Sequence, residues 1–141
     1  MPSSTQEDYL RSIYRIMEES ASDLVKSHDL ADRLGLDKAT ISVQLKLLQK
    51  NGWLTQYPYS PIILTPEGLR IAQNLTYKHR IIEYYLIQEL KISVEKIHQE
   101  AHQLEHAVSD EVVIQMAKKL GNPTHCPHGK KLPPFKPEKI C

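Results

Sequence analysis

The sequence is poor in the features that mark secreted and membrane proteins. Its 141 residues include only two cysteines, Cys126 and Cys141, whereas a small disulfide-bonded domain needs more of them, spread through the chain. No apolar run approaches the length of about eighteen residues that a transmembrane helix needs. The polar N-terminal segment does not resemble a secretory signal. We therefore expect a cytoplasmic protein with no membrane partner.

Motifs of hydrolytic catalysis are also missing. The sequence has no H-E-x-x-H pattern, and no positioned set of Ser or Cys with His and Asp is evident. We expect no enzymatic activity and no small organic substrate.

A strong charge of one sign is absent, since the net charge is +1 at pH 7. The charges are nevertheless uneven. Residues 26–50 hold five Lys/Arg and three Asp, residues 79–111 three Lys/Arg and seven Asp/Glu, and residues 118–141 six Lys and one Glu. This distribution suits a protein whose ends face a polyanion and whose centre binds cations.

The spacing of apolar residues predicts a mainly helical protein. Asp37 and Thr65 are good N-caps, and Pro66 suits a first helical position. After Gly121 the chain is rich in proline, which precludes regular structure. We expect helices at about 5–19, 30–34, 38–51, 66–90, 94–106 and 110–120, and a β-hairpin formed by 53–57 and 62–64.

The order of helix, helix, three-residue turn, helix and hairpin is typical of a winged helix-turn-helix. Small and hydroxyl side chains at the start of the third helix let its backbone approach base edges, and its lysines can reach phosphates. The alternative is a winged helix used only for protein contact. Because the head is only mildly basic, a monomer would bind double-stranded DNA weakly, which favours a homodimer. The candidate DNA-binding residues are Lys38, Ala39, Thr40, Ser42, Val43, Lys46 and Lys50.

Histidines are concentrated in the second half, where six of the seven lie at or after position 79. The residues His98, His102, Glu105 and His106 have a spacing that places all four on one helical face. Upstream, a His and a Glu at positions 79 and 83 form a second pair. A single pair is commonly a surface hydrogen bond. Grouped imidazoles and carboxylates are what Mn²⁺, Fe²⁺, Co²⁺, Ni²⁺ and Zn²⁺ accept, so we expect metal binding.

The sequence contains the motifs EDYL from Glu7, LADRLGLDKATIS, LTPEG, KHRIIEYYL, VEKIHQEAHQLEH and SDEV from Ser109. In this order they resemble those of the diphtheria-toxin-repressor and manganese-transport-repressor family of metal-dependent bacterial regulators. The resemblance extends almost without gaps to about Gly129. It implies a repressor of metal-uptake genes in which Fe²⁺ or Mn²⁺ orients two DNA-binding heads on a palindromic operator.

Two metal sites follow from the resemblance when its motifs are carried over residue by residue. The primary regulatory site would consist of Asp8, His102, Glu105 and His106. The ancillary site would consist of His79, Glu83 and His98, and the motif Cys-Pro-His-Gly would add Cys126 and His128 in some members.

The sequence departs from the family patterns at two positions. Where manganese-type members often have a second carboxylate, this chain has Arg11, which cannot ligate a metal. Where iron-type members have a cysteine, it has His102. Two imidazoles and two carboxylates favour Fe²⁺ marginally over Mn²⁺, and Zn²⁺, Co²⁺ or Ni²⁺ should also bind in vitro.

The domain organisation that we expect is a winged helix-turn-helix over 1–72, a helical metal-binding and dimerisation domain over 73–121 and a Pro-rich extended tail over 122–141. The larger members of the family carry a further small β-domain after the Pro-rich segment. Two other functions remain open at this point, a metal-independent winged-helix regulator and a metalloenzyme.

Overall fold

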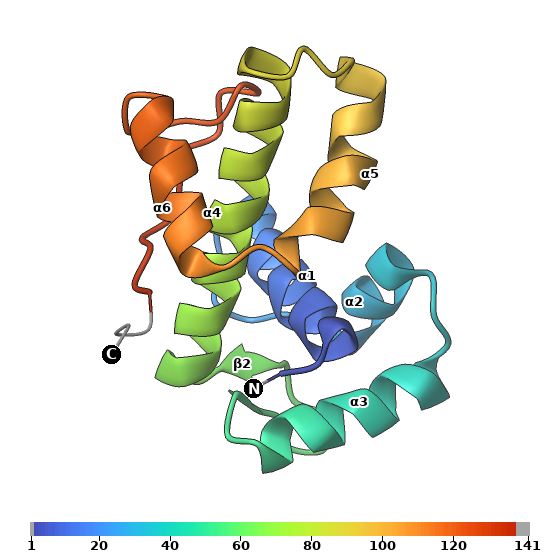
Figure 1. Cartoon of the computed structure of the whole chain (residues 1–141). Coiled ribbons are helices and arrows are strands. Elements are labelled where there is room, and N and C mark those ends of the chain that lie inside the picture. Colours follow the sequence, from blue (N-terminus) through green and yellow to red (C-terminus); the bar gives the residue numbers. More distant parts are fainter. Residues whose placement is uncertain (1, 138–141) are drawn as a thin grey trace. The chain divides into compact units, whose positions relative to one another are not determined.

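The computed structural model describes residues 2–137 and divides the chain into two compact units, Met1–Ala72 and Gln73–Cys141. The described residues are mainly helical and include one small sheet, which confirms the predicted fold class (Figure 1). Its elements are α1 (Ser4–Ser20), α2 (Ser27–Leu34), α3 (Lys38–Lys50), β1 (Leu54–Thr55), β2 (Ile63–Leu64), α4 (Pro66–Gln88), α5 (Val94–Glu105) and α6 (Asp110–Lys119).

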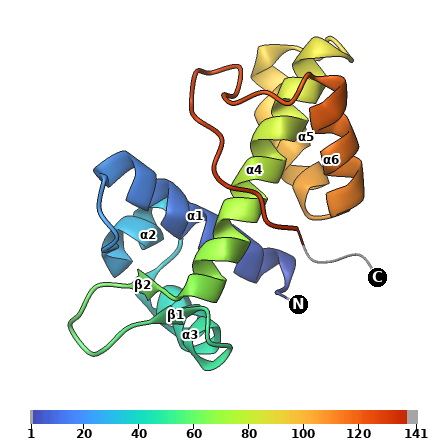
Figure 2. The same ribbon diagram turned by 90° about the vertical axis from the view of Figure 1, so that its left-hand side faces the viewer.

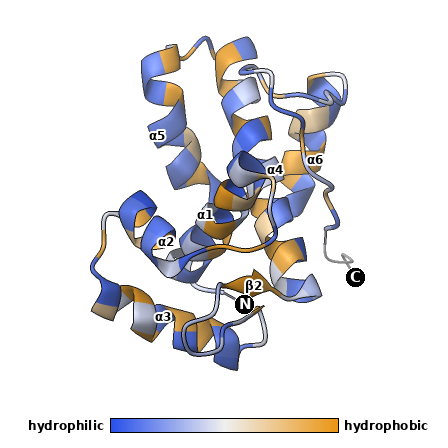
Figure 3. Cartoon of the chain, turned by 180° about the vertical axis from the view of Figure 1, so that it is seen from behind, coloured by the Kyte–Doolittle hydropathy of each residue, from blue (hydrophilic) through white to orange (hydrophobic). Residues whose placement is uncertain are grey.

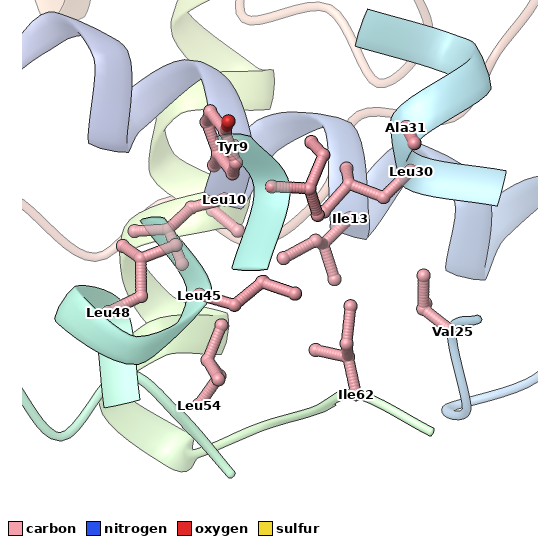
Figure 4. Packing of buried hydrophobic residues seen from close by; sticks show 12 residues of the cluster. Tyr9, Leu10, Ile13, Val25, Leu30, Ala31, Leu45, Leu48, Leu54 and Ile62 are labelled. Carbon is pink, nitrogen blue, oxygen red and sulfur yellow. The ribbon is translucent and has the colours of Figure 1, made fainter. Parts of the chain in front are cut away.

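Side chains from three helices and the hairpin fill the core of the first unit. Leu10 and Ile13 of α1 are fully buried, and the same cluster includes Leu45 of α3 and Ile62 beside the sheet (Figure 4). Each such side chain stabilises the fold by about 1.5–3 kcal/mol through its removal from water. The helix-turn-helix is thus held by the apolar faces that its sequence spacing predicts.

Local capping fixes where these helices begin. The side chain of Ser3 accepts a hydrogen bond from the backbone N–H of Gln6, and the side chain of Gln6 accepts one from Ser3. Asp37 caps α3 by accepting from the N–H of Thr40 at 2.7 Å, as predicted. Between α2 and α3, Gly35 has a φ of 66°, a left-handed conformation that glycine adopts at little cost.

The hairpin is shorter than the sequence suggested. Leu54 pairs with Leu64 and Thr55 pairs with Ile63 in an antiparallel sheet (Figure 2). Pairing stops at this point because the N–H and the carbonyl of Ile62 bond to the backbone of Val25 instead, and the N–H of Gln56 donates to the side chain of Gln49.

The start of α4 is tightly packed against the hairpin. Thr65 caps the helix by accepting from the N–H of Gly68 at 3.1 Å, and its hydroxyl donates to the carbonyl of Gly52 at 2.7 Å. A Cβ atom on Gly68 would lie 1.8 Å from the carbonyl oxygen of Trp53. Only glycine fits at this position.

The second unit is built from the greater part of α4 together with α5 and α6. One cluster joins Ile82 of α4 to Ile97 and Ala101 of α5, and another joins Ile81 to Val113 of α6. Orange and blue alternate along α5 when the ribbon is coloured by hydropathy, as expected for a helix with one apolar face (Figure 3).

The Pro-rich segment that follows α6 packs on this unit. The ring of Phe135 stacks on that of Tyr77 of α4 with centroids 4.5 Å apart. The side chain of Asn74 exchanges two hydrogen bonds with the backbone of Lys136. None of the helices described is both long and apolar enough to span a bilayer.

Candidate metal centre

The last turn of α5 brings three possible metal ligands together. The side chain of Glu105 is fully buried, whereas those of His106 and His102 are 15% and 45% exposed. Oxygen Oε1 of Glu105 lies 3.8 Å from Nε2 of each histidine. Ile97 and Ala101 orient the helix by packing against α4, and Glu105 is buried on the same side of α5 as these two residues.

These three residues fit a divalent transition metal by their chemistry and spacing. One ligand atom from each lies within 4.8 Å of the others. Two imidazole nitrogens and a carboxylate oxygen suit Fe²⁺, Mn²⁺ or Zn²⁺. The fourth expected ligand, Asp8, lies on α1 of the first unit and is partly buried there.

A second set joins α4 to the beginning of α5. Nε2 of His79 lies 2.9 Å from Oε1 of Glu83 and 3.2 Å from Nδ1 of His98. His79 and Glu83 are buried, whereas the side chain of His98 is 67% exposed. The ligand atoms of all three lie within 4.8 Å of one another, so this set also fits a divalent cation.

The electrostatics of this second set favour an ionised carboxylate. Burial alone would raise the pKa of Glu83, but a hydrogen bond from His79 and the charges of His79, His128 and His98 outweigh it. The net result is a pKa of Glu83 below its ordinary value. Glu83 is therefore ready to ligate a cation over the whole neutral range.

The two sets are connected by a direct contact. Nδ1 of His79 lies 3.1 Å from Oε2 of Glu105, so a ring of the second set touches the carboxylate of the first. Both side chains are buried. Spacing along the sequence could not reveal this link, because it depends on how α4 crosses α5.

The Cys-Pro-His-Gly motif lies in a turn of the tail. Cys126 is buried, and its N–H donates to the carbonyl of Lys130 at 2.8 Å. Within the described part of the chain, neither Cys126 nor His128 belongs to the group of ligand atoms formed by His79, Glu83 and His98. His128 is nevertheless close enough to lower the pKa of Glu83.

The first unit presents an exposed outer face on α3. Its inner face is buried through Ile41, Leu45 and Leu48. Val43 lies on the outer face, where 58% of the residue is exposed. All seven candidate DNA-binding residues are exposed, namely Lys38, Ala39, Thr40, Ser42, Val43, Lys46 and Lys50.

A groove beside this face adds residues that the sequence patterns did not single out. It has a volume of about 940 Å³ and is lined by α3, the start of α2 and the hairpin loop, including His28, Gln56, Tyr57 and Tyr59. Tyr57 and Tyr59 are 70% and 108% exposed. Two aromatic residues in a proline-containing turn were the available signal, since exposed aromatic rings are often binding residues.

Comparison with known proteins places both units in one family. Residues 1–62 match the model of the iron-dependent repressor N-terminal DNA-binding domain. Residues 65–134 match the iron-dependent repressor metal-binding and dimerisation domain.

Individual relatives agree with these matches. The chain is 33% identical over 129 residues to the diphtheria toxin repressor of Corynebacterium efficiens, covering 92% of this chain and 55% of that protein. It is 31% identical over 109 residues to the transcriptional regulator MntR of Geobacillus kaustophilus, covering 77% of this chain and 75% of the relative. The chain thus spans about half the length of the first relative and three quarters of the second.

Solved structures give the same picture. A manganese-dependent transcriptional repressor in complex with manganese aligns with a TM-score of 0.81 and 34% identity over 92% of this chain and 58% of that one. The manganese regulator SloR aligns with a TM-score of 0.79 and 32% identity over 94% of this chain and 61% of that one. The predicted resemblance is confirmed, and the chain belongs to the iron-dependent repressor family, whose members are transcriptional repressors rather than enzymes.

Proposed function

We propose that this protein is a cytoplasmic, metal-dependent transcriptional repressor of metal-uptake genes, activated by Fe²⁺ or Mn²⁺. One observation carries the proposal. Two sets of imidazole and carboxylate ligands lie in one unit of a chain whose other unit is a winged helix with an exposed α3. When bound, the cation supplies fixed positive charge that holds its ligands in one arrangement.

The residues that would hold the regulatory metal are His102, Glu105 and His106, together with Asp8. The family resemblance assigns Asp8 to the same metal. Because Asp8 belongs to the DNA-binding unit, its ligation would link metal occupancy to DNA affinity. Linkage then requires DNA to tighten metal binding by the same factor.

The ancillary set would be His79, Glu83 and His98. The buried thiol of Cys126 and the imidazole of His128 are candidates to join it. The charge of His128 already contributes to lowering the pKa of Glu83.

The active species would be a homodimer that places two heads on a palindromic operator. Exposed apolar surface on α6, including Val112 at 45% exposure, is suited to contact with a second copy. Two heads would then meet successive major grooves, roughly 34 Å apart. Sedimentation should show a dimer for the metal-loaded protein at tens of micromolar. A metal-loaded monomer at that concentration would exclude this assembly.

The experiment that tests the function is selection of duplex DNA from a random library, followed by a metal titration. With Mn²⁺ present, the full chain should enrich a palindromic sequence, and a chelator should release it. Binding that is unchanged by the chelator would favour a metal-independent regulator. Hydrolase or oxidase activity that disappears in His102→Ala would favour a metalloenzyme.

A further inference from the structure

His79 occupies a special position because its ring contacts both sets of candidate ligands. Its Nε2 atom faces Glu83 and His98, at 2.9 and 3.2 Å. Its Nδ1 atom lies 3.1 Å from Oε2 of Glu105.

Glu105 divides its two oxygens in a complementary manner. Oε2 faces His79, and Oε1 lies 3.8 Å from Nε2 of both His102 and His106. The carboxylate therefore lies between the ring of one set and the imidazoles of the other. The contact with His79 at Oε2 is one of the interactions that hold this carboxylate in place.

Ligation at one ring nitrogen decides what the other nitrogen does. When Nε2 of a neutral histidine ligates a cation, the remaining N–H is at Nδ1. In this protein that N–H points at Oε2 of Glu105 and would donate to it. Partners of this kind fix the orientation of a metal ligand and typically change metal affinity 10–100-fold when they are removed.

Packing makes the contact rigid enough to transmit such an effect. His79 is 1% exposed and Glu105 is 1% exposed, so water does not compete for the hydrogen bond. Ile82 of α4 packs in one cluster with Ile97 and Ala101 of α5. This packing holds together the two helices that carry His79 and Glu105.

We propose that His79 couples the two metal sites: ligation of His79 Nε2 in the ancillary set holds Nδ1–H on Oε2 of Glu105 and thereby aims Oε1 at the primary site. The proposal rests on the proposed function for the existence of both sites. Occupation of the ancillary set should then raise affinity at the primary set by about fivefold or more, within the usual range of coupling between sites. The reverse holds by the same factor.

The test is a Mn²⁺ titration of the full chain, with free Mn²⁺ counted by electron paramagnetic resonance. Wild-type protein should bind two Mn²⁺ per chain with positive cooperativity. His98→Gln disables the ancillary set at an exposed residue and leaves His79 beside Glu105. The remaining Mn²⁺ should bind about fivefold or more weakly than the primary-site Mn²⁺ of wild type.

Two substitutions at position 79 separate the hydrogen bond from the ligand. An asparagine amide can take the place of Nδ1, whereas a glutamine amide reaches towards the place of Nε2. His79→Asn should retain primary-site affinity within about threefold of wild type, and His79→Gln should lose about tenfold. His125→Gln, a histidine outside both sets, is the control and should bind both Mn²⁺ ions as wild type does.

Each outcome decides between the proposals. Binding of two Mn²⁺ ions with independent affinities, and equal primary-site affinity in all variants, would overturn the coupling and leave the proposed function intact. A stoichiometry of one Mn²⁺ per wild-type chain would also overturn it, because coupling needs two sites. Absence of binding of both Mn²⁺ and Fe²⁺ would overturn the proposed function itself. If the position-79 variants fail to fold by circular dichroism, His98→Gln decides alone.

Discussion

Glu83 and Glu105 show how a single residue's surroundings prepare it for cation binding. Both carboxylates are buried, which by itself is costly for a charged group. Each has imidazole nitrogens close by, which can donate hydrogen bonds to the carboxylate and carry a positive charge when protonated. A buried carboxylate surrounded by histidines is stabilised when a cation replaces the protons of those histidines.

Metal affinity should depend on pH through the histidines rather than through Glu83. The lowered pKa of Glu83 means that its interactions stabilise the fold above its unfolded pKa and are lost only as pH falls through the lower folded pKa. The ligating histidines must be neutral, so protons compete with Mn²⁺ for the imidazoles and Mn²⁺ affinity should fall as pH is lowered, before Glu83 is protonated. Isothermal titration between about pH 8 and 5.5 measures this.

Glu83→Gln is the matched variant for the pH dependence. It should weaken Mn²⁺ binding to the ancillary set at every pH, and affinity should still fall with pH because the ligating histidines remain. Wild-type affinity that stayed constant down to about pH 5.5 would mean that these histidines are not ligands.

At the scale of secondary-structure elements, the start of α4 depends on one glycine. Gly68→Ala would drive a Cβ into the carbonyl of Trp53, which belongs to the backbone and cannot rotate away. Alanine favours a helix interior by about 1 kcal/mol over glycine, too little to offset overpacking against backbone. The free energy of unfolding should drop by about 3 kcal/mol, as measured by urea denaturation.

The neighbouring substitution Glu67→Ala provides the comparison. It removes an exposed ion pair with Arg70, with N and O atoms 2.8 Å apart. Its cost should stay below about 1 kcal/mol. Equal stability of the two variants would show that the hairpin moves aside to accommodate a side chain at position 68.

The third helix should contribute phosphate contacts through Lys46. The side chain is exposed beside the groove at the hairpin. Lys46→Ala should weaken binding to the selected duplex at every Mn²⁺ concentration and lower the slope of log affinity against log salt by about one. Lys96→Ala, an exposed lysine on α5, should leave both quantities unchanged. A salt slope unaltered by Lys46→Ala would remove this residue from the interface.

The secondary-structure elements were predicted well from the sequence. Caps at Asp37 and Thr65 and the apolar spacing of α1, α3 and α5 are local signals, and they placed these helices within a few residues. The sequence did not reveal the contact from His79 to Glu105 or the stacking of Phe135 on Tyr77. Both contacts join segments far apart in sequence, so their geometry is set by helix packing rather than by local spacing.

At the scale of the whole molecule, the proposed regulation depends on ligands contributed by both units. His102, Glu105 and His106 belong to the helical unit, and Asp8 belongs to the DNA-binding unit. A protein of this kind favours one of its available conformations when the regulatory metal is bound, and DNA selects the same conformation. Asp8 is therefore the residue whose loss should separate metal control from DNA binding itself.

Metal-controlled DNA binding is tested most directly by fluorescence anisotropy on the selected duplex, with wild type and Asp8→Ala compared across a Mn²⁺ titration. Wild-type affinity should rise about tenfold or more as Mn²⁺ binds, which is within the usual range of coupling. Asp8→Ala should fold and dimerise as wild type does and lose most of that rise. A rise as large in Asp8→Ala would exclude Asp8 from the regulatory site, and a wild-type affinity that responds neither to Mn²⁺ nor to Fe²⁺ would contradict the proposed function.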